Sequence, residues 1–337
     1  MDITQRRPLG GSGLEVTAAS YGGGSLGNFY RRITNSEAET LLHAVWDAGI
    51  RYFDTAPFYG RGRSERRIGA FLGDQPRDEF VISTKVGRLL EPAIDGVEED
   101  GIFFDPAPFN VHYDYSYEGI LRSHEHSLQR LGLDRVDILY VHDIDRMIHG
   151  ADADDRLADL RGGGIRALEE LRRSGAIRAY GLGVNEIQTC LDCLNYADPD
   201  AFLLAGRFTL LEQDAARSLL DLCVQHNVSI VAGSVFNSGI LATGAQPGAR
   251  YNYGPALPDV MATVEKLASA CGAHGVELAA AALQFPFSHP AVASVLLGVG
   301  TLHSLTRNIA GLSAEIPESL WQELADLGLP PPAAIGS

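Results

Sequence analysis

Short apolar runs alternate with segments of helical periodicity along almost the whole chain. After a glycine-rich start that predicts a short hairpin, the apolar runs predict strands at residues 16–21, 51–56, 78–87, 135–143, 178–186, 201–206, 228–234 and 293–300. The periodic segments predict helices at residues 36–49, 64–73, 117–133, 165–177, 188–196, 215–227, 258–274, 277–285 and 304–312, with another after Pro317. The strands show little polar alternation, which is typical of a parallel sheet covered on both faces.

The number of strand–helix repeats defines the expected architecture. About eight repeats in 337 residues favour the α/β class and a closed (β/α)8 TIM barrel, with an N-terminal β-hairpin and a single domain over residues 1–337. An open dinucleotide-binding sheet would place G-x-G-x-x-G directly after the first strand and at the start of a helix. The run GGGSLG at residues 22–27 comes close, but a long polar and aromatic loop follows it, so we discount the open sheet.

Three of the expected connections are long and rich in aromatic residues: residues 22–34, 87–116 and 236–257. All three follow strands, so we place them at the C-terminal face of the barrel, which carries the active site in this fold. Long loops at that face commonly form a substrate pocket and its lid.

Composition and charge narrow the class of partner. The net charge of −16 disfavours nucleic acid and anionic membranes as partners, and no apolar stretch is long enough to span a bilayer. The start of the chain lacks the apolar run of a signal peptide, so we expect a cytoplasmic protein with a small-molecule partner. Cys190 and Cys193 form a C-x-x-C inside a helical segment with no second ligand pair, and we interpret them as ordinary helical cysteines. The sequence leaves the oligomeric state open.

Ionisable residues stand at the ends of three expected strands. Asp54 follows residues 51–53, Lys85 follows an apolar run and His142 ends another, while Tyr59 lies five residues after Asp54. Of the 27 basic residues only Lys85 and Lys266 are lysine. A nearby ammonium lowers the pKa of a tyrosine, so we expect Lys85 to activate Tyr59 and Asp54 to hold Lys85 charged. His142 would contact the reacting oxygen. This set moves protons but supplies no hydride, so a redox cofactor is required.

These motifs resemble those of the aldo-keto reductase family. FDTAPFYGRGRSERRIGAFL is similar to the family's aspartate–tyrosine signature, ISTKVG to its lysine strand and VDILYVHD to its histidine strand. The resemblance covers about residues 9–327. It implies that Asp54, Tyr59, Lys85 and His142 form the catalytic tetrad, with tyrosine as the general acid/base. It also implies a nicotinamide cofactor bound across the barrel mouth without a Rossmann motif.

The resemblance also implies a set of cofactor contacts. Asn185 matches the asparagine that holds the carboxamide, although Val184 stands where the family usually has serine, and the family's carboxamide glutamine has no match in LLAGRFTLL. Members that use NADPH place cations where this chain has Gly298 and Ser304, so we expect a preference for NAD over NADP, with Arg307 the one nearby cation. The expected cofactor-binding residues are Gly23, Gly24, Asp54, Asn185, Ser234, Phe236, Ser238, Gly298, Gly300, Ser304, Arg307 and Asn308.

Within the family, VHDIDR, IRAYGLGVNE and FTLLEQ resemble two kinds of enzyme equally well. One is the bacterial aldose 1-dehydrogenases that act on L-fucose and D-threo sugars, and the other is pyridoxal 4-dehydrogenase. Both substrates exist largely as cyclic hemiacetals, whose oxidation gives a lactone. We favour the sugar, for which Asp143, Asp145, Arg146 and His149 offer polar contacts. The expected substrate contacts are Phe29, Phe58, Tyr59, His142 and Asp143.

Two further alternatives belong to other classes. Some members of this fold are chiefly cofactor-binding regulatory subunits, a role against which the intact tetrad argues. A metal-dependent hydrolase is suggested by the H-x-H at His124 and His126. We place that motif in a helix, where the two side chains diverge, and therefore expect no metal.

Overall fold

Eight parallel strands close a barrel in the computed structural model, which describes residues 1–98 and 101–327. Each strand pairs in parallel with its two neighbours, and β9 and β10 also join, so the sheet has no free edge. The expected (β/α)8 architecture is confirmed. Around the barrel the strands are β3 (Ala19–Gly22), β4 (Tyr52–Asp54), β5 (Val81–Val86), β8 (Ile138–His142), β9 (Ala179–Val184), β10 (Ala201–Ala205), β11 (Ser229–Gly233) and β14 (Val292–Leu297).

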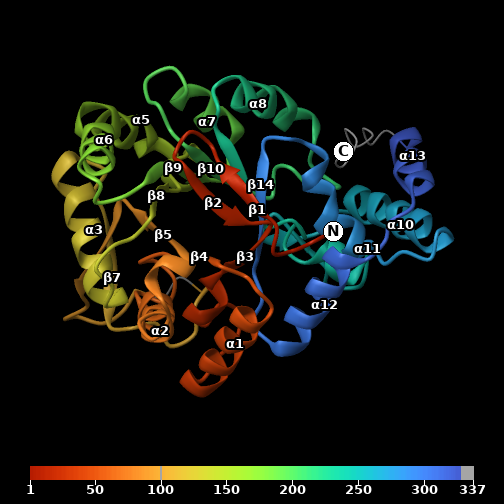
Figure 1. Ribbon diagram of the computed structural model, residues 1–337, viewed down its shortest axis with the longest axis horizontal. Helices are drawn as coiled ribbons and strands as arrows, with labels where there is room; N and C mark the ends of the chain where they lie inside the picture. The colour runs from red at the N-terminus through yellow and green to blue at the C-terminus, as the bar shows by residue number, and fades with distance from the viewer. Residues whose placement is uncertain (99–100, 328–337) are drawn as a thin grey trace.

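Helices surround the barrel (Figure 1). They bury their apolar sides against it. The first begins at a capping box in which Thr34 and Glu37 each accept a hydrogen bond from the other's backbone N–H. Among the described residues, no helix is long and apolar enough to cross a membrane. The helices are α1 (Asn35–Asp47), α2 (Arg63–Leu72), α3 (Tyr117–Leu131), α6 (Ile165–Ser174), α7 (Ile187–Cys193), α8 (Asp214–Gln225), α10 (Pro258–Ala273), α11 (Leu278–Gln284), α12 (Leu302–Ser313) and α13 (Glu318–Asp326).

The N-terminal hairpin covers the end of the barrel at which the strands begin, as its position across the barrel in Figure 1 shows. It consists of β1 (Arg6–Leu9) and β2 (Leu14–Thr17), and its apolar side chains pack with Tyr52, Val81 and Ile138 in the barrel interior. The single strand expected at residues 16–21 was wrong, because β2 pairs with β1 and the chain then leaves the hairpin at Ala18 to begin β3 against β14.

The long connections at the opposite end contain more regular structure than the sequence indicated. The connection after β5 holds the hairpin of β6 (Arg88–Pro92) and β7 (Phe109–Tyr113). The one after β11 holds α9 (Ile240–Thr243) and the short pair β12 (Arg250–Tyr251) and β13 (Gly254–Pro255). After β8, α4 (Arg146–His149), α5 (Ala153–Asp159) and a π-helical turn (Leu160–Gly164) precede α6. Short 3-10 turns complete the fold at Gly23–Gly27, Arg77–Glu79, Gly150–Asp152 and Phe285–Ser288.

Candidate active site

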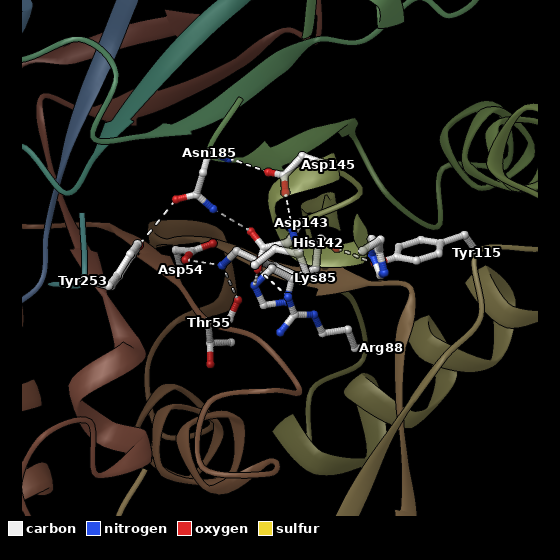
Figure 2. A network of polar contacts seen from close by, with 12 residues as sticks. Asp54, Thr55, Lys85, Arg88, Tyr115, His142, Asp143, Asp145, Asn185 and Tyr253 are labelled. Atoms are coloured by element: carbon white, nitrogen blue, oxygen red, sulfur yellow. Dashed lines mark hydrogen bonds and ion pairs between the residues drawn. The ribbon is translucent and has the colours of Figure 1, made fainter. Parts of the chain in front are cut away.

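A buried ion pair joins the ends of β4 and β5 (Figure 2). The Nζ of Lys85 donates to Oδ2 of Asp54 at 2.6 Å and to the backbone oxygen of Thr55 at 2.9 Å, and the hydroxyl of Ser83 donates to Oδ1 of Asp54 at 2.7 Å. Burial opposes the charge of Lys85, but Asp54 and Tyr59 outweigh burial and raise the pKa of the lysine. Asp54 thus favours the charged form of Lys85, in the direction that the sequence indicated.

Tyr59 lies in the turn after β4, with its ring centroid 4.7 Å from the Nζ of Lys85. The turn packs directly on the backbone of Gly27: a Cβ on Gly60 would lie 2.4 Å from the oxygen of Gly27, so side chains are excluded there. Burial raises the pKa of Tyr59, while Lys85 acts in the opposite direction. Lys85 thus acts in the expected direction, but it offsets the burial of Tyr59 only in part, and the pKa of the phenol stays above its usual value.

His142 ends β8 and is buried beside Tyr59. The two ring centroids are 5.8 Å apart and the ring planes are nearly perpendicular, at 89°. The hydroxyl of Tyr115 donates to the backbone oxygen of His142 at 2.8 Å, which ties this strand end to the loop that follows β7. Burial lowers the pKa of His142 well below its usual value, and the positive charges of Arg88 and Lys85 act in the same direction. All three effects favour the neutral imidazole.

Asp143 follows His142 in a left-handed backbone conformation, with φ of 45°. Its Oδ2 accepts from Nη2 of Arg88 at 2.5 Å, and its Oδ1 accepts from Nδ2 of Asn185 at 3.1 Å. Burial raises the pKa of Asp143, and the cations of Arg88 and Lys85 act against burial. Sequence reasoning missed Arg88, because no periodicity marks the hairpin that brings it here; its position directly after the lysine strand was the available signal.

Aromatic rings form a wall beside Tyr59. Phe103 lies 5.7 Å from Phe29, 5.2 Å from Phe58 and 6.2 Å from Tyr59, measured between ring centroids. Phe29 and Phe103 also form a backbone bridge between the first two long connections. The structure thus brings the expected substrate contacts Phe29 and Phe58 together with Tyr59 and His142, and it adds Phe103.

The expected carboxamide contact, Asn185, follows β9 at the same end of the barrel. Its backbone N–H donates to Asp145 at 2.9 Å, and its side-chain oxygen accepts from the hydroxyl of Tyr253 at 3.4 Å (Figure 2). After β11, Ser234 and Ser238 adopt left-handed conformations, with φ of 52° and 61°, and Phe236 packs against the core. Ser238 accepts from the N–H of Tyr253 at 3.0 Å, so the loop after β11 brings Tyr253 to Asn185.

The remaining cofactor candidates follow β3 and β14. Gly298 is exposed, and a Cβ there would meet no atom within 4 Å. Ser304 lies in the first turn of α12 and forms a capping box with Thr301. Arg307 donates to the backbone oxygen of Ala242 at 2.5 Å, so its guanidinium already has a partner. Gly23, Gly24, Gly300 and the buried Asn308 complete this set.

This donor set suits a nicotinamide nucleotide. The candidates follow β3, β4, β9, β11 and β14, and all of these strands end on the face that carries Tyr59 and His142. Asn185 supplies an amide and Ser234 and Ser238 supply hydroxyls, the kinds of group with which a carboxamide pairs, and Gly298 leaves the backbone after β14 open on one side. The residues present therefore fit the expected cofactor.

Other polar candidates have partners of their own. Asp145 caps α4, Arg146 forms an exposed ion pair with Asp154, and Nε2 of His149 lies 2.9 Å from the hydroxyl of Tyr115.

Among the described residues, no three histidine, cysteine or acidic side chains are grouped as metal ligands would be. His124 is buried and His126 exposed on α3, which confirms that the H-x-H lies in a helix with diverging side chains. Cys190 and Cys193 are buried free thiols on α7.

Comparisons with known proteins agree with this geometry. Residues 19–328 match the profile of the Aldo/keto reductase family. Pyridoxal 4-dehydrogenase from Microbacterium luteolum is 42% identical over 98% of this chain and 99% of its own length. D-threo-aldose 1-dehydrogenase from a Pseudomonas species is 43% identical over 95% of this chain and 96% of its own. The holo form of an aldo-keto reductase from Bacillus halodurans shares the fold, with a TM-score of 0.73, 23% identity and coverage of 99% and 98% of the two chains.

Proposed function

The chain belongs to the aldo/keto reductase family, and on this premise we propose that it oxidises the cyclic hemiacetal of an aldose to a lactone, with NAD as the preferred cofactor. The observation that carries the proposal is the placement of Tyr59, Lys85 and His142 at one barrel end, beside the aromatic wall of Phe29, Phe58 and Phe103. In this arrangement the aromatic faces pack against the apolar face of a pyranose ring, and Tyr59 and His142 contact its anomeric hydroxyl.

In the proposed reaction Tyr59 takes the proton of the hemiacetal hydroxyl. Lys85 stabilises the phenolate form of Tyr59, and Asp54 keeps Lys85 charged and in place. Neutral His142 donates a hydrogen bond to the same oxygen, which becomes the carbonyl oxygen of the lactone.

A bound nicotinamide would accept the hydride from the hemiacetal carbon. Asn185 would hold its carboxamide, and the loops after β11 and β14 would contact the rest of the nucleotide. The preference for NAD over NADP is supported by Gly298 and Ser304, which offer no cation for a 2′-phosphate.

Pyridoxal is a second candidate substrate, favoured by the relative from Microbacterium luteolum at 42% identity. Its flat ring would stack on the same aromatic wall, and its internal hemiacetal would present an equivalent hydroxyl to Tyr59.

A substrate panel tests the proposal. The purified protein is incubated with excess NAD and, separately, L-fucose, D-arabinose, L-galactose or pyridoxal, and NADH formation is followed, with NADP in parallel. We expect turnover with the sugars and NAD. Turnover with pyridoxal alone would transfer the assignment to the second candidate, and NADP outpacing NAD would contradict the cofactor preference.

The role of Tyr59 is tested with Tyr59→Phe, which removes only the hydroxyl. We expect turnover to fall by roughly 10²–10⁴-fold, the usual contribution of a positioned general base, because no other group then takes the proton. Binding of NAD, measured by quenching of protein fluorescence, should be unchanged. Near-normal turnover in this variant would rule out the assignment.

A further inference from the structure

Arg88 is a buried cation that the proposed proton transfer does not use. It is 3% exposed, and its guanidinium carbon lies 4.4 Å from the ring centroid of Phe58 and 5.4 Å from that of Tyr113. These rings fix the guanidinium against the wall of the site. A buried charge is costly unless it is paired, so its partner indicates its role.

That partner, Asp143, is shared with His142. The Oδ2 of Asp143 lies 2.5 Å from Nη2 of Arg88 and 3.4 Å from Nε2 of His142. A carboxylate beside an imidazole favours the protonated ring, and a nearby cation opposes protonation. Because arginine is permanently charged and makes the shorter contact, it neutralises Asp143 before histidine does.

Two further charges lie near His142. Lys85 of β5 disfavours the protonated imidazole, as Arg88 does, and its ammonium is also paired with Asp54 of β4. The Tyr59 ring faces the imidazole, while Tyr115 contacts the backbone oxygen of His142 and links it to His149. The remaining oxygen of Asp143 accepts from Asn185, so the carboxylate is held on both sides.

We propose that Arg88 is a positioning residue: by holding Asp143 in an ion pair, it keeps His142 a neutral hydrogen-bond donor to the reacting oxygen. The part of this inference that concerns the reacting oxygen rests on the proposed function. Burial and both neighbouring cations disfavour the protonated imidazole, as the lowered pKa of His142 reflects. Without Arg88, the carboxylate of Asp143 would lack its arginine partner and would stabilise the imidazolium form of His142.

The first test reads the charge of His142 directly and needs no substrate. Protein carrying ¹⁵N-labelled histidine is titrated by NMR, with the His142 signal assigned from its loss in His142→Gln. In the unaltered protein we expect the ring to stay neutral at pH 6 and above. In Arg88→Met, which keeps the apolar stem, its pKa should rise by at least about one unit toward or above the usual ~6.5. The matched control Arg88→Lys retains the charge and should keep His142 neutral.

A second variant separates charge balance from packing. In the double variant Arg88→Met with Asp143→Asn the carboxylate is also removed, so His142 should become neutral again, as in the unaltered protein. If Arg88→Met does not fold, Arg88→Gln carries the same prediction, since glutamine still donates to Asp143. An unchanged His142 titration in Arg88→Met or Arg88→Gln would overturn the proposal. The proposal would also be overturned if the double variant folds when neither Arg88→Met nor Arg88→Gln does. In that case Arg88 would serve only as the counter-ion that keeps Asp143 compatible with the fold.

The pH profile of turnover connects the inference to the reaction. In Arg88→Met, kcat/KM should acquire an additional ionisation at the pKa that NMR reports for His142, and the double variant should lose it. An NMR shift with no matching change in kcat/KM would contradict the role of neutral His142 in the reaction. Absence of turnover with every sugar and with pyridoxal would count against the proposed function, and the NMR result would stand independently.

Discussion

At the residue scale, burial and neighbouring charges together set the pKa values of the ionisable groups in the site. The pKa of Lys85 is raised because Asp54 and Tyr59 outweigh burial, whereas the pKa of His142 is lowered because burial and two cations act together. Tyr59 lies between these cases, since Lys85 only partly offsets its burial. The ionisation of Tyr59 should therefore determine how the rate of proton transfer depends on pH.

The sign of that dependence follows from Tyr59. Its pKa lies above the usual value of about 10, and oxidation needs the phenolate as base. The rate of sugar oxidation should thus rise steadily from neutral pH through about pH 10. The reverse reaction, reduction of the lactone, needs the phenol, and its rate should be nearly constant over that range. Initial rates in both directions across a buffer series measure this. A plateau of the oxidation rate below about pH 8 would show that another group is the base.

At the scale of elements, three of the four residues proposed as catalytic were predictable from the sequence because they stand at or next to strand ends. An apolar run that stops at Asp54, Lys85 or His142 fixes its last residue at the barrel mouth, whatever the rest of the fold does. Arg88 and Tyr253 arrive instead on hairpins inside long connections, where pairing is set by tertiary contacts and leaves no period in the sequence.

Gly87 shows why such a hairpin forms at this place. Its φ is +95°, and a Cβ would lie 2.2 Å from the ring of Tyr115. Gly87→Ala should therefore lower the free energy of unfolding by about 3 kcal/mol or more, through backbone strain and steric overlap together. Urea unfolding measures this. The matched control is Gly132→Ala, where φ is +66° with no atom within 4 Å, and the loss should be only about 1 kcal/mol. Equal losses would contradict the steric argument.

The segment after β14 carries the prediction on cofactor choice. Gly298 is exposed with open space around its Cβ, so Gly298→Lys adds a cation without steric cost. If this segment faces the 2′ position of the adenosine ribose, kcat/KM with NADP relative to NAD should increase roughly tenfold, as one charge-assisted hydrogen bond provides. Gly272→Lys, on α10, adds the same charge elsewhere and should leave the ratio unchanged. No change in Gly298→Lys would remove this segment from the cofactor site.

At the scale of the whole molecule, stability and chemistry are placed at opposite ends of the barrel. The β1–β2 hairpin lies across the end where the strands begin (Figure 1) and packs its apolar side chains into it. Asp54, Lys85 and His142 lie where the strands finish. The barrel itself was predictable from the repeat of strands and helices. The junction of β2 and β3 was not, because the apolar run continues through Ala18 while the pairing partner changes.

This separation predicts that the hairpin can be weakened without loss of chemistry. Leu14 is 2% exposed, so Leu14→Ala should lower the free energy of unfolding by about 2–5 kcal/mol through lost contacts and a cavity. At a temperature where the variant remains folded, kcat/KM should match that of the unaltered protein. The control Val224→Ala removes a half-exposed apolar side chain from α8 and should cost under about 1 kcal/mol. A large loss of kcat/KM in folded Leu14→Ala would show that the two ends are coupled.

The burial of Lys85 has a consequence for chemical labelling. The chain contains two lysines, and Lys85 is 2% exposed and held protonated by Asp54, so it is neither accessible nor nucleophilic toward amine-reactive reagents. Lys266 is exposed on α10. Among lysine side chains, a dye or surface linker that reacts with amines should therefore attach at Lys266, as well as at the α-amino group of the chain, and leave Lys85 unmodified.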